Sequence, residues 1–347
     1  MKNKTYSIFV TMLVFLLLVS FDSYAGNRKK AGAAAAPELL IPIGARDLAL
    51  GGSSIGTTRG IEAMFWNPAG LARSAYSADA IFSRLDYLAG IDLNYVAVAG
   101  KFGNLGSVGF SIKSLALGDI PVTTEDAPDG TGATIEPTFL IVGPSYSKIV
   151  NDRVSVGFNV NVISESFPEV NVSATGVSFT GGLQYTGLAG LEGLTLGVVV
   201  RNIGPQMGFS GSGLLRQGTT ADATRGETFV KIDAATDELP STFEIGASYT
   251  VNAGELNKLE FSGMFVNNNF SDDEARFGVE YGYNDTFFLR GGFSDAPDAL
   301  TNTFIFGATL GAGVRFKTGG IDIEADYGWM QTDLFNNINA FSLKLGF

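Results

Sequence analysis

The sequence predicts an all-β protein: a closed antiparallel transmembrane β-barrel of about fourteen strands, with an N-terminal plug (hatch) segment in its lumen. Three observations support this fold class. Segments of about ten residues alternate apolar and polar side chains, as a wall between lipid and a polar interior requires. Gly (45) and Phe (27) are abundant, yet beyond residue 25 no apolar run reaches the length of a membrane helix. Short and long connections follow one another in turn.

Residues 1–25 are predicted to be a cleaved export signal. Lys2 and Lys4 precede an apolar run over 8–20, and small residues stand three before and one before a cut after Ala25. The run is short for a membrane helix, and no Cys follows that could carry a lipid. We expect residues 26–74 to form a linker and plug, residues 75–347 to form the barrel, and the mature protein to lie in the cell outer membrane.

Two residue types are missing from the chain. It contains no Cys and no His, so disulfides, zinc sites built on these residues and nucleophilic triads are excluded. The formal net charge of −12 argues against a nucleic-acid partner. The one basic patch, Arg28-Lys29-Lys30, is interpreted as a solvated linker. We therefore expect no enzyme activity, no cofactor and no metal, although carboxylate chemistry remains formally open.

Alternation defines the expected strands. Residues 154–162 place Val or Phe at every second position, and residues 321–329 alternate Ile, Ala, Tyr and Trp with acidic residues and Gly. The full set of expected strands is 78–87, 92–102, 107–115, 138–148, 154–164, 177–186, 194–203, 242–251, 259–266, 276–283, 286–293, 303–316, 321–329 and 340–347.

The connections give an independent check, because such barrels have short periplasmic turns and longer outer loops. If the last strand ends in the periplasm, the periplasmic connections are 103–106, 149–153, 187–193, 252–258, 284–285 and 318–320. The outer connections include 116–137, 165–176, 204–241 and 294–302, and only 88–91 is unexpectedly short. This regularity favours a barrel over a soluble β-sandwich.

The chain ends on an aromatic residue, Phe347, at the end of an alternating strand. Because lipid offers no hydrogen bonds, the first and last strands must pair. A terminal aromatic also resembles the signal read by the outer-membrane barrel assembly machinery. Phe347 is therefore the expected assembly signal, and that machinery and outer-membrane lipid are the expected partners.

The segment 37–74 does not alternate and carries short motifs. They are Gly44-Ala45-Arg46, Leu50-Gly51-Gly52 and Trp66-Asn67-Pro68-Ala69-Gly70-Leu71-Ala72. In this order they resemble the N-terminal signature of the PorV/PorQ family, a branch of the FadL-like barrels. Arg201-Asn202-Ile203-Gly204-Pro205 resembles a second feature of that family. The resemblance implies a fourteen-stranded barrel plugged by this segment.

Two functions follow from the resemblance. PorV is a partner of the type IX secretion system, which implies an adaptor that binds secreted proteins or secretion components. FadL-like members pass hydrophobic small molecules, which implies a channel with an apolar pocket near the plug. This chain is shorter than PorV, with modest outer loops, and its residues alone do not separate these hypotheses.

Charged and apolar clusters supply further candidates. Lumen-facing charges are expected at Arg276, Glu280, Arg290, Asp322, Glu324 and Asp326, as a ligand path, a plug-holding network or an ordinary polar wall. Acidic loop clusters around Asp126, Asp273 and Asp295 are interpreted as solvated loops rather than calcium sites. The loop 204–241, with Met207 and Phe209 among its apolar residues, could collect substrate, grip a protein or cover the rim.

Overall fold

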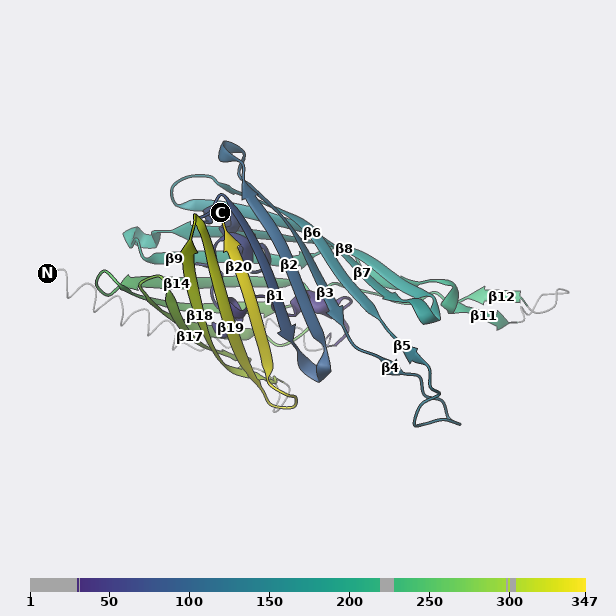
Figure 1. The fold of residues 1–347 in the computed structure, drawn as a ribbon. Coiled ribbons are helices and arrows are strands. Elements are labelled where there is room, and N and C mark those ends of the chain that lie inside the picture. The colour runs from purple at the N-terminus through teal and green to yellow at the C-terminus, as the bar shows by residue number, and fades with distance from the viewer. Residues whose placement is uncertain (1–29, 31, 219–227, 298, 300–303) are drawn as a thin grey trace.

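The computed structural model describes residues 30, 32–218, 228–297, 299 and 304–347. The expected export signal, Arg28 and Lys29 lie outside these residues. Fourteen antiparallel strands form the closed barrel predicted from the sequence, shown in Figure 1. They are β1 (Ala78–Asp86), β2 (Asp92–Lys101), β3 (Ser107–Ala116), β6 (Thr138–Ile149), β7 (Val154–Phe167), β8 (Val172–Thr186), β9 (Leu194–Ile203), β14 (Thr242–Asn252), β15 (Asn257–Asn268), β16 (Glu274–Tyr283), β17 (Phe287–Asp295), β18 (Phe306–Thr318), β19 (Ile321–Thr332) and β20 (Ile338–Gly346).

The first and last barrel strands close the ring. β1 pairs with β20 with Phe82 opposite Leu343, and the amide of Phe347 donates to the carbonyl of Ala78 at 2.9 Å. Closure leaves no open sheet edge, which a bilayer could not accommodate. No helix of the described residues is long and apolar enough to cross a membrane.

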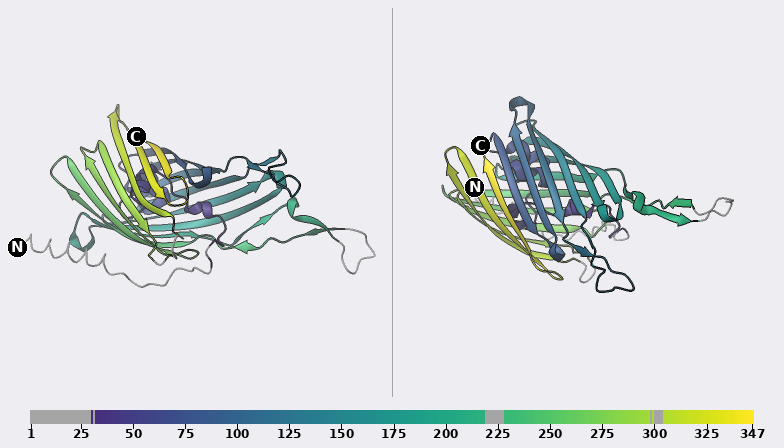
Figure 2. Two further views of the ribbon diagram at one scale, coloured as in Figure 1. Left: turned by 90° about the horizontal axis from the view of Figure 1, so that it is seen from below. Right: turned by 45° about the vertical axis from the view of Figure 1, so that its right-hand side comes forward.

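The two ends of the barrel differ. The turn end carries the short connections β2–β3, β6–β7, β8–β9, β14–β15, β16–β17 and β18–β19. The opposite loop end carries two small hairpins that project from the barrel in Figures 1 and 2. They are β4 (Ile120–Pro121) with β5 (Thr134–Ile135), and β11 (Leu215–Gly218) with β12 (Thr228–Lys231).

The outward face of the barrel is apolar. Phe82 on β1, Phe158 on β7 and Phe341 on β20 are each about half exposed, at 48%, 51% and 54%. Their sequence neighbours Ser83, Asn159 and Ser342 point inward and are buried. This alternation is that of strands placed between lipid and a filled lumen.

Short helical turns fill the lumen, as Figure 2 shows. They are η2 (Pro37–Leu40), α2 (Ala45–Ala49), η3 (Gly60–Glu62), α3 (Ala63–Trp66) and η4 (Pro68–Arg73). We call Pro37–Arg73 the plug. Most of its side chains are buried, because fourteen strands enclose more space than their own side chains fill. The other short 3₁₀ turns are η5 (Leu88–Gly90), η6 (Gly103–Leu105), η7 (Pro168–Val170), η8 (Leu188–Gly190) and η9 (Ser212–Leu214).

The chain threads the barrel from the loop end to the turn end. Lys30 pairs with Glu238 of the long loop at 2.7 Å, and the amide of Ala35 donates to the carbonyl of Glu238 at 3.0 Å. Leu39 then packs on Ile141 and Leu239 near the loop end. The plug finishes at Arg73, beside the turn-end start of β1. The residues before the plug are therefore held at the loop-end mouth rather than forming a free linker.

One expectation about the loops was wrong. The connection expected over 165–176 is only η7 and Asn171, because Pro168 and the left-handed Asn171 (φ 53°) make a tight turn that lets β7 and β8 extend. The loop 204–241 adds two short strands to the barrel sheet. Its strand β10 (Met207–Ser210) pairs with β8, and β13 (Thr236–Asp237) pairs with β10.

Candidate functional site: the plug and the lumen it divides

The Asn-Pro-Ala-Gly turn is fixed by hydrogen bonds to both plug and wall. Nδ2 of Asn67 donates to the carbonyls of Ile55 (2.8 Å) and of Leu183 on β8 (3.1 Å), and its Oδ1 accepts from the amide of Ala69. A side chain at Gly70 would place its Cβ 2.0 Å from the carbonyl oxygen of Thr58. The motif therefore serves to seat the plug.

The remaining motif residues also build the plug. Nε1 of Trp66 donates to the carbonyl of Ile43 at 3.1 Å. Gly52 has a φ of +72°, and a Cβ there would lie 2.8 Å from the Trp66 ring. Gly44 and Gly51 also have positive φ, +77° and +64°. The glycines are required because the chain turns left-handed against its own aromatic residue and the wall.

Inward glycines of the barrel receive the plug backbone. A Cβ at Gly157 would lie 2.3 Å from the carbonyl oxygen of Pro68, and one at Gly182 would lie 2.1 Å from Oδ1 of Asn67. Five other strands contribute glycines whose Cβ would meet plug atoms at 2.6 Å or less: Gly197, Gly278, Gly292, Gly311 and Gly328. Much of the glycine content of the strands thus permits close approach of plug and wall.

Two buried cations of the wall, Arg201 and Lys113, donate hydrogen bonds to the plug backbone. Arg201 of β9 binds Glu244 of β14 through Nε (2.8 Å) and Nη2 (2.9 Å). The same guanidinium donates to the carbonyls of Phe65 and of Trp66. Lys113 of β3 donates to the carbonyls of Glu38 (2.7 Å) and Ile41 (2.6 Å). The second motif of the sequence, which begins at Arg201, is therefore a plug contact.

The predicted lumen charges form a network below the plug. Arg290 pairs with Glu280 (2.6 Å) and Asp326 (2.5 Å), and Glu324 pairs with Arg315 (2.7 Å). Arg46 of the plug joins at Glu280 (3.1 Å). The last two candidates lie at the edges: Arg276 pairs with Glu274 at 2.8 Å, and Asp322 accepts from the hydroxyl of Tyr76 at 2.8 Å.

Lys344 and Glu260 also belong to this network, although sequence reasoning did not single them out. Lys344 of β20 reaches Glu62 of the plug (2.9 Å) and Glu324 (2.8 Å), and Glu260 of β15 lies 3.8 Å from Arg46. The alternation of the expected strands already placed both residues on the inward face. Their partners could not be predicted from the sequence.

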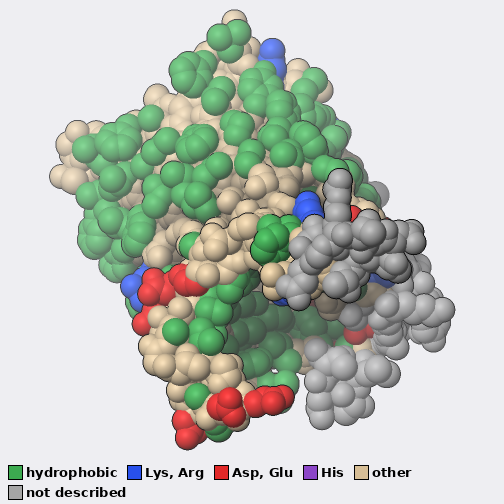
Figure 3. All heavy atoms as spheres, turned by 90° about the vertical axis from the view of Figure 1, so that its right-hand side faces the viewer, with side chains coloured by type: hydrophobic (Ala, Val, Ile, Leu, Met, Phe, Trp, Pro, Cys, Tyr) green, Lys and Arg blue, Asp and Glu red, His purple; other side chains and the backbone are tan. Residues whose placement is uncertain are grey.

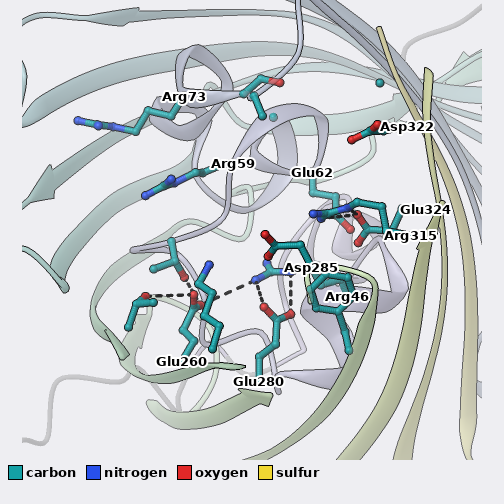
Figure 4. Close-up of a pocket in the computed structure, with 18 of the residues that line it drawn as sticks. Arg46, Arg59, Glu62, Arg73, Glu260, Glu280, Asp285, Arg315, Asp322 and Glu324 are labelled. Atoms are coloured by element: carbon teal, nitrogen blue, oxygen red, sulfur yellow. Dashed lines mark hydrogen bonds and ion pairs between the residues drawn. The ribbon is translucent and has the colours of Figure 1, made fainter. Parts of the chain in front are cut away.

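The plug divides the lumen into two unlike parts. On the turn side lies a cavity of about 1170 Å³, open at one end and walled largely by charged and polar side chains. Figure 4 shows Arg46, Glu280, Glu324 and Arg315 around it. We call this cavity the vestibule. It could hold water, ions or a polar group of a ligand.

On the loop side an apolar surface lines part of the lumen. Leu85, Leu93 and Leu115 of the wall pack with Ile43 and Met64 of the plug. Partly buried side chains continue this surface: Phe65, Tyr87, Leu88, Ile91, Leu117, Phe139 and Phe306. Figure 3, which views the loop end, shows a hollow lined by hydrophobic side chains. We call this set of partly buried residues the apolar mouth.

Two further predicted features are the acidic loop clusters and the C-terminal residue Phe347. Among the described residues no group of three or more acidic side chains is arranged to hold a metal ion. Phe347 is about half exposed, at 49%, and its backbone completes the pairing with β1.

Glu62 should make plug docking depend on pH. Burial, reinforced by Asp47 and Asp326, raises the pKa of Glu62 from 4.5 to about 7, while Lys344 and Arg46 oppose the rise. Folding then takes up a proton between these values, so the contribution of Glu62 to stability is full below pH 4.5 and is lost as pH rises through 7. We expect the melting temperature of the wild type to rise relative to that of Glu62→Gln between pH 8 and pH 5. Equal pH profiles of the two proteins would refute this.

Solved structures share this fold. The CymD monoaromatic hydrocarbon channel superposes with a TM-score of 0.53 at 13% identity, covering 89% of this chain and 98% of CymD. The Ralstonia pickettii toluene transporter TbuX gives 0.51 at 15% identity (88% and 98% covered). A Pseudomonas aeruginosa FadL homologue gives 0.50 at 14% identity (88% and 98% covered).

This likeness establishes the fold alone: a plugged fourteen-stranded barrel, the fold of these three neighbours. No protein-family model matches the chain. No curated protein matches it in sequence either.

Proposed function

We propose that the protein is an outer-membrane channel for hydrophobic small molecules, which enter at the loop end. The observation that carries the proposal is the apolar mouth, which leads to the plug in a barrel with the fold of hydrocarbon channels. Hydrophobic compounds partition into such a surface because burial removes apolar area from water. With the loop end facing the outside of the cell, the turn end and the vestibule face the periplasm.

The adaptor hypothesis has less support. The motifs that resemble the PorV/PorQ family are engaged in seating the plug: Asn67 binds β8, Arg201 binds the plug carbonyls, and Gly70 has no space for a side chain. A plug of this kind is needed by any channel of this fold. The motifs therefore give no reason to prefer a secretion role.

Uptake of labelled toluene by cells that lack their own channels of this type tests the proposal. We expect expression of the protein to accelerate uptake, and Leu88→Lys to reduce the gain about tenfold, because the mutation places a charge in the apolar mouth. Leu105→Lys is the matched control. Leu105 also lies in a short 3₁₀ turn between neighbouring strands, but at the turn end and 75% exposed, so uptake should not change.

Other outcomes would count against the channel. Uptake that is unaffected by expression would contradict transport of this class of compound. Stoichiometric co-purification of exported proteins in mild detergent, together with no effect on toluene uptake, would instead favour the adaptor. Equal loss of uptake in both lysine variants would show that the mouth is not the entry surface.

A further inference from the structure

Two plug arginines face the vestibule. Arg59 precedes η3 and Arg73 ends η4, and both line the cavity. Figure 4 shows the two side chains extending to the same side, away from the network around Glu280 and Glu324. Within the described part of the chain, neither guanidinium forms an ion pair. The deeper cations differ: Arg46, Arg290, Arg315 and Lys344 all pair with acidic side chains.

Arg73 is only partly satisfied. Its Nε donates to Oγ of Ser155 on β7 at 2.8 Å, which fixes the plane of the guanidinium. Its Nη2 is buried and has no hydrogen-bond partner among the described residues. A buried donor without a partner costs free energy and calls for an explanation. Burial, followed by the charge of Arg59, lowers the pKa of Arg73, as expected for two like charges near each other.

Gly60 and Ser74, the sequence neighbours of Arg59 and Arg73, both contact Asp79. Gly60, next to Arg59, has a φ of +68°, and a Cβ there would lie 2.9 Å from Oδ2 of Asp79. That carboxylate oxygen already accepts from the hydroxyl of Ser74 at 2.7 Å. The residues next to each arginine, Gly60 and Ser74, thus pack against Asp79.

We propose that Arg59 and Arg73 form a binding site for an oxyanion, a carboxylate or a phosphate, in the vestibule. Guanidinium groups present planar pairs of donors that match the oxygens of such anions, and an anion would offset the repulsion between the two cations. The anion could be free in solution or be the headgroup of an amphiphile. The site does not depend on which molecules enter at the loop end.

Calorimetric titration of the purified protein in a nonionic detergent tests the site, with inorganic phosphate and dodecanoate as probes and dodecanol as the neutral control. We expect one or both anions to bind, and the affinity to fall at least tenfold in Arg59→Gln/Arg73→Gln. Binding of phosphate would identify a site for free anions. Binding of dodecanoate without phosphate would identify a site for an amphiphile headgroup. In both cases dodecanol should not bind in a manner sensitive to the arginines.

Two single variants serve as controls for misfolding of the double variant. Arg59 is exposed, and its side chain forms no hydrogen bond or ion pair with the described residues. Arg59→Gln should therefore fold normally and still lower the affinity for the anion severalfold. Lys258→Gln removes another exposed cation that lines the same cavity, from β15, and should leave the affinity unchanged. Binding of neither anion, or equal affinity in the wild type and Arg59→Gln, would overturn the proposal, whatever the result of the toluene assay.

Discussion

Gly182→Ala is expected to displace the Asn-Pro-Ala-Gly turn from the wall and to open the lumen to ions. The new Cβ would lie 2.1 Å from Oδ1 of Asn67 and 2.9 Å from Cδ of Pro68, so that the turn or the strand must move. Overpacking of this kind costs about 1–3 kcal/mol, and the loss of the Asn67 hydrogen bonds adds to it. Because β8 is held on both sides by the closed sheet, the plug is the part that should yield. Conductance in planar bilayers and trypsin cleavage of the plug should both increase.

The neighbouring glycine provides the control. Gly181 precedes Gly182 on β8, points outward and has nothing within 4 Å of its Cβ position. Gly181→Ala therefore changes the same strand by the same methyl group without touching the plug. We expect it to match the wild type in conductance and in trypsin sensitivity. If the two variants behaved alike, the plug would not be seated by the close approach seen at Gly182.

The barrel could be predicted from the sequence because its signal is local. Alternation fixes which side chains face inward, and this was enough to place Glu280, Arg290, Glu324 and Asp326 in the lumen. The same alternation places Gly157 and Gly182 inward. However, nothing in their own strands shows that these glycines face the backbone of a plug more than 80 residues away along the chain.

Long-range partners account for most of what the sequence could not show. Glu244 and Lys344 stand at inward positions of expected strands, but their pairing with Arg201 and Glu62 joins residues that are 43 and 282 apart in the chain. The direction of the plug was not predictable either. It depends on Glu238, in a long loop, meeting Lys30 and Ala35 at the loop end. Alternation gives the face of each side chain but not the partner across a closed lumen.

Arg201→Met is expected to destabilise the protein by about 3–5 kcal/mol, because it leaves Glu244 buried without its cation. Arg201 and Glu244 are only 5% and 4% exposed, and Arg201 also supplies the donors for the carbonyls of Phe65 and Trp66. Thermal unfolding in detergent should show a large drop in melting temperature. By contrast, Arg84→Met removes an exposed pair with Asp92, which solvent screens, and should leave the melting temperature close to that of the wild type.

A double variant separates the role of Arg201 in stability from its role in holding the plug. Arg201→Met/Glu244→Leu replaces both charges by apolar groups, so no uncompensated buried charge remains and much of the lost stability should return. The carbonyls of Phe65 and Trp66 still lack their donor, and trypsin should continue to cleave the plug faster than in the wild type. Recovery of both properties in the double variant would mean that Arg201 stabilises the wall alone. Recovery of stability without recovery of protease resistance would establish it as the residue through which the wall holds the plug.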